Sequence, residues 1–175
     1  MKILAIIDAQ TDFINGSLAV GLEPWQKAKA EILKLSQVNC YDWVIFTRDW
    51  HPLNHCSFKE QGGPWPAHCV QKSKGAEIDH ELLKLISTIP NSLIISKGQD
   101  TNQEEYGVDL LLNFKEINAN TSVDVVGLCF DYCVAECARI TKEKHPEVSV
   151  KIYKSATVAI DKTAKPNVGS ASVIE

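Results

Sequence analysis

The sequence predicts a three-layer α/β/α sandwich built on a mainly parallel sheet. Five short apolar runs, each typical of a strand that is buried on both faces, alternate with segments in which apolar residues recur at helical spacing. Strands that alternate with helices pair in parallel through right-handed crossovers, and the helices then cover both faces of the sheet. Residues 1–175 are expected to form a single domain, because no linker, repeat or low-complexity tract divides them.

Five strands and four helices are expected along the chain. Pro24 precedes the first helix and Pro90 follows the second, as prolines often do at helix boundaries. Residues 161–175 contain few apolar side chains and are predicted to form a loosely held tail. The expected strands are residues 2–7, 43–47, 93–96, 123–126 and 148–153, and the expected helices are residues 25–38, 77–89, 106–117 and 131–144.

The composition is that of an ordinary soluble protein, with 45% hydrophobic and 23% charged residues. The net charge is −4, and lysine and arginine do not cluster, which argues against nucleic acid and anionic membranes as partners. No apolar run approaches the roughly 18 residues of a membrane span, and the N-terminus lacks a signal-peptide pattern. We expect a cytoplasmic protein whose six cysteines are free, catalytic or metal-bound.

Chemically distinctive residues follow four of the predicted strands. Asp8 follows the first strand, and Asp49 and His51 follow the second. Lys97 follows the third strand, and residues 129–133 follow the fourth. Open parallel sheets bind ligands beyond the carboxyl ends of their strands. A carboxylate, a carboxylate–imidazole pair, an ammonium and a thiol at these ends therefore predict a catalytic site at one edge of the sheet.

Cys133 is predicted in the first turn of the helix that leaves the fourth strand. Unpaired backbone N–H groups and the helix dipole favour negative charge there, so they would stabilise a reactive thiolate. A second interpretation stays open, because Cys129, Cys133 and Cys137 recur every four residues and unpaired cysteines are often buried packing residues.

Lys97 and Asp8 each have a catalytic and a structural interpretation. An ammonium between Asp8 and Cys133 would stabilise a thiolate or an oxyanion, whereas a lysine after a strand is usually solvated. Asp8 could accept the thiol proton, or it could only cap the turn that follows it. The remaining cysteines, Cys40, Cys56 and Cys69, are interpreted as packing residues.

Residues 50–74 form a long segment without a helical or alternating pattern. Loops of this length inside a compact domain are usually functional or disordered, and the histidines and tryptophans here argue against disorder. Imidazole and carboxylate ligands suit zinc, iron or manganese, and three protein ligands leave positions for water or substrate. Alternatively, each histidine only hydrogen-bonds the loop backbone. The predicted ligands of one divalent metal, zinc before iron or manganese, are Asp49, His51 and His68, with His55 as a possible addition.

Several motifs carry a family resemblance. In chain order they read IIDAQTDF, TRDWHPLNHCSF, GGPWPAHCV followed by GAE, SKG, and VVGLCFDYCV. Together they span residues 6–134 and resemble the nicotinamidase/pyrazinamidase group of the isochorismatase-like cysteine hydrolases. The resemblance implies the isochorismatase-like, Rossmann-like version of the predicted α/β fold.

The resemblance also implies a role for each matching residue. Asp8 would be the general base, Lys97 the charge-stabilising lysine and Cys133 the nucleophile. The metal ligands would be Asp49, His51 and His68, with His55 contributing in some members of the family.

The same resemblance implies how a substrate binds. A cis peptide between Leu128 and Cys129 would accompany an oxyanion hole formed by the N–H groups of Cys129 and Cys133. Phe13 and Trp65 would flank a pyridine ring whose nitrogen faces the metal.

The implied reaction converts nicotinamide, or an analogue such as pyrazinamide, to nicotinate and ammonia through a thioester, in NAD salvage. The first alternative is a related hydrolase that acts on another small amide or carbamoyl compound. A thiol redox or zinc-storage protein is disfavoured, because there is no C-x-x-C motif and no second cysteine cluster. A binding module without catalytic activity also remains open. The oligomeric state, monomer or homo-oligomer, is open as well.

Two departures from the family pattern affect the expected pocket. Many relatives have a Tyr-Ser-x-Phe segment after the lysine, whereas Gly107, Val108 and Asp109 follow Tyr106 here. This leaves one pocket wall uncertain. The usual last helix and strand are also doubtful in the residues after the fifth predicted strand.

Overall fold

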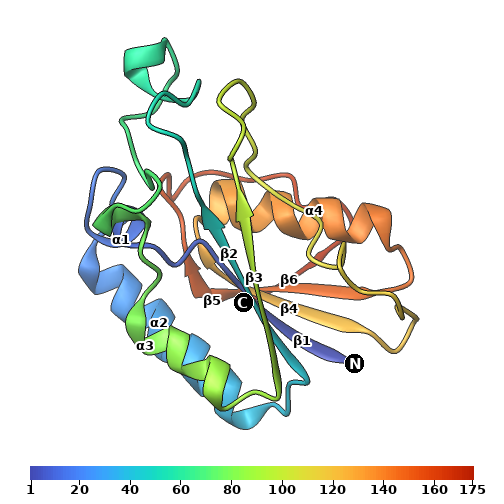
Figure 1. Cartoon of the computed structure of the whole chain (residues 1–175). Helices are drawn as coiled ribbons and strands as arrows, with labels where there is room; N and C mark the ends of the chain where they lie inside the picture. The colour runs from blue at the N-terminus through green and yellow to red at the C-terminus, as the bar shows by residue number, and fades with distance from the viewer.

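The computed structural model describes residues 1–175, which form a six-stranded sheet in the order β3-β2-β1-β4-β5-β6. Every neighbouring pair of strands is parallel. The predicted α/β class is therefore confirmed (Figure 1). The strands are β1 (Lys2–Ile7), β2 (Trp43–Asp49), β3 (Asn91–Lys97), β4 (Ser122–Leu128), β5 (Ser149–Val158) and β6 (Ser172–Ile174).

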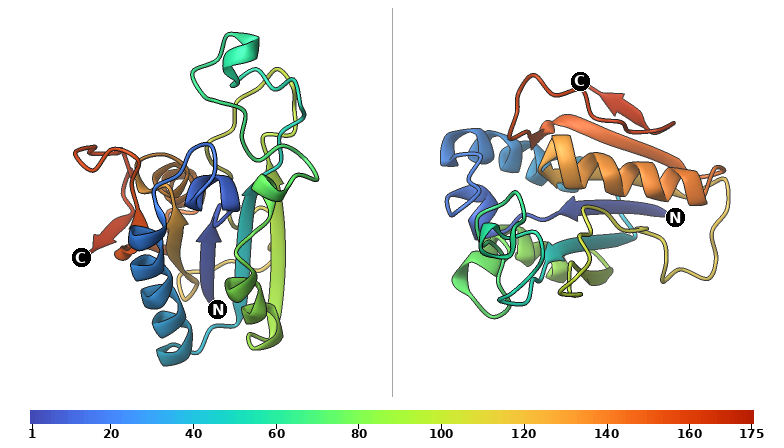
Figure 2. Two further views of the ribbon diagram at one scale, coloured as in Figure 1. Left: turned by 90° about the vertical axis from the view of Figure 1, so that its left-hand side faces the viewer. Right: turned by 90° about the horizontal axis from the view of Figure 1, so that it is seen from above.

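Helices cover both faces of this sheet, as the prediction of three layers required. Helices α2 (Leu22–Val38) and α3 (His80–Leu83) lie on one side, and α4 (Ala135–Lys144) lies on the other (Figures 1 and 2). None of the helices combines the length and the apolar character that a membrane span needs. The shorter elements are α1 (Thr11–Ile14), the 3-10 helices η1 (Lys59–Gln61), η2 (Lys74–Ala76) and η3 (Lys84–Ser87), and the π-helical turn η4 (Phe130–Val134).

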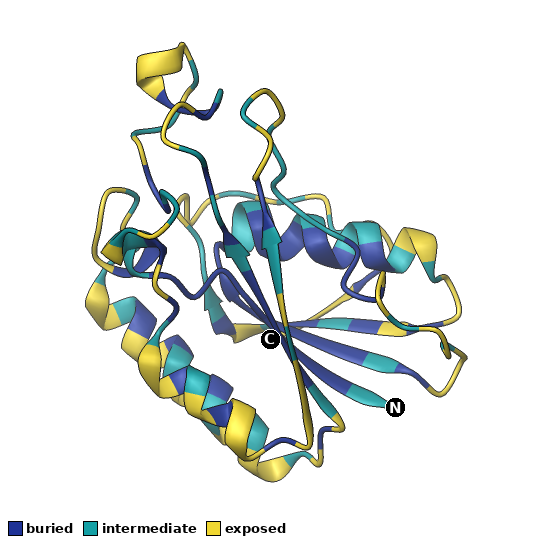
Figure 3. Cartoon of the chain, viewed as in Figure 1, coloured by how far each residue is buried: buried dark blue, intermediate teal, exposed yellow.

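The sheet divides the apolar core into two halves, because successive side chains of a strand point to opposite faces. In β1, Leu4 and Ile6 pack with Trp25 of α2 on one face. Ile3 and Ala5 belong to the other half, together with side chains of α4. Figure 3 shows the central strands as the most buried part of the chain, with exposed residues concentrated in the loops and on the outer helix surfaces. The core thus fixes the strands whose carboxyl ends carry the polar residues.

The predicted helix at residues 106–117 is wrong, since this segment consists of turns without a helix. Its backbone donors find partners on α4 instead. The Val108 N–H lies 3.5 Å from Cys137 Sγ, and the Leu110 N–H donates to Thr141 Oγ1 at 3.0 Å. Leu110 is buried against the same helix. Tertiary contacts therefore replace the hydrogen bonds that a helix would have made.

The predicted helix at residues 77–89 is shorter than expected and consists of α3 followed by η3. It begins after Asp79, whose carboxylate accepts hydrogen bonds from the N–H groups of Glu81 and Leu82. An aspartate in this position satisfies backbone donors that a helix start leaves unpaired.

The predicted loose tail contains a sixth strand, so that expectation is wrong. Residues of β6 pair with Lys151, Ile152 and Tyr153 of β5, and Lys154 forms an ion pair with Glu175 at 3.0 Å. All residues of β6 are exposed, and the strand has only three residues, so it leaves no long apolar run in the sequence. The usual last helix is absent, because turns and irregular backbone connect β5 to β6.

Asp79 provides a test of this local structure. Burial opposes ionisation of its carboxyl group, but hydrogen bonds from Trp25, the Leu82 N–H and Lys29 outweigh burial and lower its pKa. A lowered pKa stabilises the folded state above the unfolded pKa, near 4, and this contribution disappears as the pH falls through the folded pKa. We expect Asp79→Ala to lower the free energy of unfolding at pH 7 by about 1–2 kcal/mol in urea titrations.

Asp79→Asn serves as the matched variant, since asparagine keeps the cap but not the charge. Its stability deficit at pH 7 should be smaller than that of Asp79→Ala and should shrink as the pH approaches 3. A deficit that stays constant between pH 7 and pH 3 would contradict the role of the charge.

Candidate active site

Four strands bring their distinctive residues to one edge of the sheet. Asp8 follows β1 directly, Asp49 ends β2, and Lys97 ends β3. Cys129 follows β4, which lies next to β1. The chain runs outward from β1 through β2 to β3 and then crosses back to β4 on the other side of β1. Such a reversal of strand order opens a crevice at the carboxyl ends of the strands.

Lys97 connects these residues. Its side chain is buried, and its Nζ lies 2.8 Å from Asp8 Oδ2 and forms a close ion pair with Asp49 Oδ1. The same atom lies 3.6 Å from Cys133 Sγ. The Cys133 sulfur and one carboxylate oxygen each of Asp8 and Asp49 lie within 4.8 Å of one another. The structure therefore brings the three predicted catalytic side chains into one cluster, and Lys97 is not a solvated surface residue.

Burial and charge set the protonation states in this cluster. Burial alone would lower the pKa of Lys97, but Asp49 and Asp8 raise it well above its usual value, so the amine stays protonated. Burial would likewise raise the pKa of Asp49, but Lys97 and His51 hold it below its usual range. Burial raises the pKa of Asp8, and Lys97 offsets only part of this effect. Asp8 is therefore the more basic of the two carboxylates.

The expected thiolate at Cys133 is not favoured in the free protein. Burial raises the pKa of its thiol well above the usual value, and the attraction of Lys97 does not compensate, because Asp8 and Asp49 act in the opposite direction. The sequence could not reveal this balance, since it depends on how completely the sulfur is buried. Cys133 therefore needs a nearby base that accepts its proton.

The backbone before Cys133 forms an unusual turn. The peptide between Leu128 and Cys129 is cis, as the family resemblance implied. Cys129 has an extended backbone, and η4 begins with the next residue and continues into α4. The N–H of Cys129 donates no hydrogen bond within the protein. Cys133 thus lies in the first helical turn, which is π-helical, beside a backbone donor that is free for a ligand.

Asp49, His51 and His68 converge on a second point next to the lysine cluster. One ligand atom from each lies within 4.8 Å of the others, and all three residues are buried. Asp49 Oδ2 is 3.4 Å from His51 Nε2 and 3.8 Å from His68 Nε2. The predicted metal ligands therefore come together although His68 is distant from the other two in sequence.

Hydrogen bonds to backbone carbonyls orient both imidazoles. His51 Nδ1 is 2.9 Å from the carbonyl oxygen of Gly98, and His68 Nδ1 is 2.8 Å from that of Pro66. A carbonyl can only accept, so Nδ1 carries the proton and Nε2 offers a lone pair, the arrangement that metal-binding histidines usually have. The buried Nε2 of His51 has no hydrogen-bond partner. Two imidazoles and one carboxylate therefore fit a divalent transition metal.

His55 lies beside this group but offers no free nitrogen. Its Nδ1 is 2.7 Å from the Ser57 hydroxyl, and its Nε2 is 3.0 Å from the Gln103 carbonyl. Its ring stacks close to that of His51, with 4.1 Å between the ring centres. In this structure His55 packs against the His51 imidazole, and both of its ring nitrogens already have hydrogen-bond partners.

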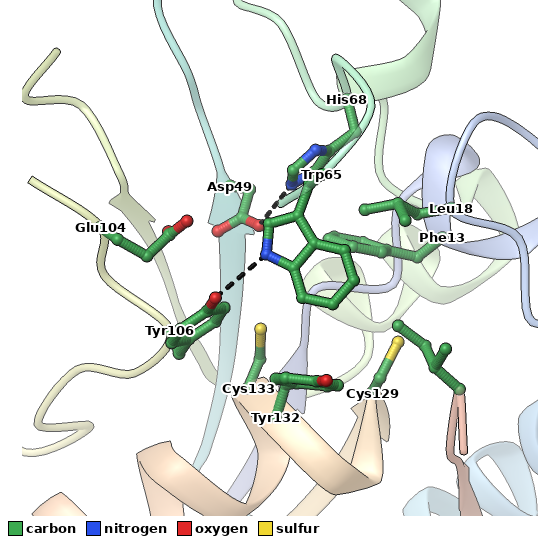
Figure 4. Close-up of a pocket in the computed structure, with 11 residues that line it drawn as sticks. Phe13, Leu18, Asp49, Trp65, His68, Glu104, Tyr106, Cys129, Tyr132 and Cys133 are labelled. Carbon is green, nitrogen blue, oxygen red and sulfur yellow. Dashed lines mark hydrogen bonds and ion pairs between the residues drawn. The ribbon is translucent and has the colours of Figure 1, made fainter. Parts of the chain in front are cut away.

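A pocket opens beside Cys133 and His68. Four aromatic side chains, those of Phe13, Trp65, Tyr106 and Tyr132, line it. Figure 4 shows the sulfur atoms of Cys129 and Cys133 directed into it. Both residues predicted to flank a ring, Phe13 and Trp65, therefore lie here. The other lining residues are Leu18, Asp49, His68, Glu104 and Ile160.

The wall after Lys97, which the sequence left uncertain, is present. The Tyr106 hydroxyl accepts a hydrogen bond from Trp65 Nε1 at 3.0 Å (Figure 4), and the Tyr106 ring contacts Tyr132 with 5.5 Å between ring centres. Gly107 lies against α4, where a Cβ would come within 2.7 Å of the Cys137 nitrogen and of the Glu136 backbone. The glycine that departs from the family pattern thus allows this segment to pack closely on the helix.

Gln10 is a site residue that the sequence reasoning missed. Its side-chain amide donates to the carbonyls of Asp49 and Ala76, and its Oε1 accepts the Asp49 N–H at 2.8 Å. It is completely buried and fixes the end of β2 that carries a predicted ligand. Its position two residues after Asp8 was the only available signal, because its partners are far away in sequence.

The chain is similar to known nicotinamidases and pyrazinamidases in sequence and in fold. No family model matches the chain. The curated nicotinamidase/pyrazinamidase of Mycobacterium tuberculosis is 30% identical over 172 residues, which cover 93% of this chain and 90% of that protein. The crystal structure of the Pyrococcus horikoshii pyrazinamidase in complex with zinc aligns with 31% identity and a TM-score of 0.68, over 92% of this chain and 88% of that chain.

A second solved structure, L. infantum PnC1 in complex with nicotinate, aligns with 28% identity and a TM-score of 0.77. The alignment covers 93% of this chain and 83% of that chain.

Gly98 gives a test of the metal group. A Cβ at this position would lie 2.3 Å from the His51 ring, so no side chain fits unless the imidazole moves. Displacing a group that orients a metal ligand typically weakens metal binding about 10- to 100-fold. We expect this loss for zinc bound by Gly98→Ala, measured by competition with a chelating dye.

Gly62→Ala is the matched control, because Gly62 also has a positive φ, of 86°, but no atom lies within 4 Å of the point that a Cβ would occupy. This variant should lose about 1 kcal/mol of stability and keep its zinc affinity. Equal zinc affinities for the two variants would contradict the assignment of His51 as a ligand.

Proposed function

Because the chain belongs to the nicotinamidase/pyrazinamidase family of isochorismatase-like cysteine hydrolases, we propose that it hydrolyses nicotinamide to nicotinate and ammonia. One observation carries the proposal: Cys133 lines an aromatic pocket and lies against the buried Asp8 and Lys97, beside Asp49 and two imidazoles. A flat heteroaromatic amide matches a pocket with this combination of aromatic walls and a nucleophile. Nicotinate is a precursor in NAD salvage, which would be the role of the product.

Asp8 and Cys133 perform the first step in this proposal. Asp8 accepts the proton of the Cys133 thiol, and the sulfur attacks the carboxamide carbon. The raised pKa of Asp8, caused mainly by burial, makes this carboxylate a suitable base. Proton transfer that accompanies attack also explains how a thiol with a raised pKa can react.

Lys97 and the backbone stabilise the charge that develops. The Lys97 ammonium, 3.6 Å from the sulfur, offsets negative charge on Cys133 as the proton leaves. The N–H groups of Cys129 and Cys133 are proposed to hold the tetrahedral oxyanion, and the free N–H of Cys129 supports this role.

The reaction then completes in three proton transfers, each involving Asp8. Protonated Asp8 gives its proton to the leaving nitrogen, the C–N bond breaks, and ammonia departs to leave a thioester on Cys133. Water attacks the thioester while Asp8 takes one of its protons. The C–S bond breaks as protonated Asp8 returns its proton to the Cys133 sulfur, and the nicotinic acid that leaves ionises to nicotinate.

We propose that Phe13 and Trp65 hold the pyridine ring and that Asp49, His51 and His68 bind a zinc ion. The zinc-bound relative of Pyrococcus horikoshii and the donor set of two imidazoles and a carboxylate support zinc. When bound, the metal would supply a Lewis acid for the ring nitrogen and thereby orient the amide toward Cys133.

Release of ammonia from nicotinamide by the purified protein tests the proposal. We expect turnover of nicotinamide and pyrazinamide and little turnover of a small carbamoyl compound such as N-carbamoylsarcosine. Cys133→Ala should reduce nicotinamide turnover by about 10⁴-fold or more, because it removes the nucleophile. Its zinc content should stay unchanged, since Cys133 is not among the proposed ligands.

Cys137→Ala is the matched control, one helical turn further along and away from the pocket lining. It should keep most of the activity. Residual activity of Cys133→Ala near that of the control would contradict the nucleophile, and absence of any nicotinamide turnover in the unsubstituted protein would contradict the function.

Removal of the metal tests its contact with the ring. We expect chelation to raise KM for nicotinamide roughly tenfold or more and to lower kcat less, because the metal mainly orients the substrate. Benzamide, which lacks the ring nitrogen, is the matched substrate, so the preference for nicotinamide over benzamide should fall in metal-free protein. An unchanged preference would contradict contact between the metal and the ring nitrogen.

A further inference from the structure

The connection between β5 and β6 contributes Ile160 to the pocket lining, although this residue is distant in sequence from the other lining residues. Residues 159–171 contain no helix or strand, so regular backbone hydrogen bonds do not hold Ile160 in place. Ile160 is 41% exposed, so packing covers only part of it. Hydrogen bonds from its backbone and from that of Asp161 add a second contact.

That contact is the carboxylate of Asp131. Its Oδ1 accepts the Ile160 N–H at 3.0 Å, and its Oδ2 accepts the Asp161 N–H at 2.8 Å. These are the only hydrogen bonds that join residues 159–171 to the rest of the chain. Hydrogen bonds to a charged acceptor are stronger than those between neutral groups.

Asp131 belongs to the same turn as the proposed nucleophile. It lies in η4, two residues before Cys133, near the start of the continuous helical segment that α4 extends. A carboxylate is favoured at the N-terminal end of a helical segment. The carboxylate thus links the turn that carries the sulfur to the segment that carries Ile160.

The segment beyond Asp161 is stabilised locally. The Asp161 side chain accepts hydrogen bonds from the Thr163 N–H and hydroxyl at 2.8 and 2.7 Å, and its carbonyl accepts the Ala164 N–H. This turn stiffens the backbone next to Ile160, and its only hydrogen bond to η4 is the one from the Asp161 N–H to Asp131. The position of Ile160 relative to Cys133 therefore depends on the end of β5, where Val158 pairs with Leu128, and on the hydrogen bonds to Asp131.

We propose that Asp131 is a positioning residue that holds Ile160 against the substrate pocket, and that Ile160 limits which substituents the ring of the substrate can carry. This inference rests on the proposed amidase function. Larger rings would then be rejected by Ile160 in the β5–β6 connection as well as by the aromatic side chains of residues 50–74 and Tyr106.

Ring-methylated substrates test the inference. We expect Ile160→Ala to raise kcat/KM for at least one of 5-methylnicotinamide and 6-methylnicotinamide about tenfold relative to nicotinamide, because one methyl group in a tight pocket changes discrimination by roughly 10- to 200-fold. KM for nicotinamide should rise while kcat changes little. Ile86→Ala is the matched control, since Ile86 has a similar exposure of 38% but lies in η3.

Substitution of Asp131 should affect the same part of the pocket as substitution of Ile160. Asp131→Ala should shift the methylnicotinamide preference in the same direction as Ile160→Ala, and the double variant should not exceed the larger single effect, because both changes remove one contact. Asp131→Asn keeps one acceptor and should give an intermediate shift. Zinc content should be unchanged in all of these variants.

The outcomes separate this inference from the proposed function. If the unsubstituted protein hydrolyses nicotinamide but Ile160→Ala keeps its methylnicotinamide discrimination, the inference is wrong and the function stands. Fully additive effects of Asp131→Ala and Ile160→Ala would overturn the link between the two residues. No nicotinamide turnover in the unsubstituted protein would overturn both proposals.

Discussion

The buried ammonium of Lys97 is the constraint on which the site depends. A charge that is removed from water is tolerated only if opposite charges surround it, and Asp8 and Asp49 provide them. Both carboxylates are held by the sheet, since Asp49 pairs in register with Lys97 and the Asp8 N–H bonds to Thr47 of β2. A shift of β3 by one residue would turn Lys97 to the other face of the sheet and leave two buried carboxylates unpaired.

Asp49 joins the two halves of the site. One of its oxygens faces Lys97, and the other faces the Nε2 atoms of His51 and His68. The proposed nucleophile and the proposed metal group therefore share one carboxylate, whose backbone Gln10 fixes on both sides. Because Asp49 is rigidly held, it would fix the proposed metal group, and a ring bound there, at a constant distance from the Cys133 sulfur.

The pocket walls come from segments that the sheet only supports. Trp65 belongs to the long loop after β2, Tyr106 to the turns after β3, and Ile160 to the connection after β5. Hydrogen bonds between side chains and to the Asp131 carboxylate hold these segments together. In many α/β enzymes the catalytic groups lie at strand ends and the pocket walls lie on loops. Loops can change in sequence without disturbing the core.

The sequence by itself determined the class of fold and the residues at the strand ends. Buried parallel strands appear as short apolar runs, and the polar residues that follow each run can be read directly from the sequence. It also supplied the motif that predicts Asp49, His51 and His68 as metal ligands. It could not determine the irregular backbone of residues 106–117, the strand β6 or the protonated state of Cys133. Those features depend on partners distant along the chain, such as Thr141 for Leu110 and Lys151 for Ser172, and on complete burial, which only the folded structure decides.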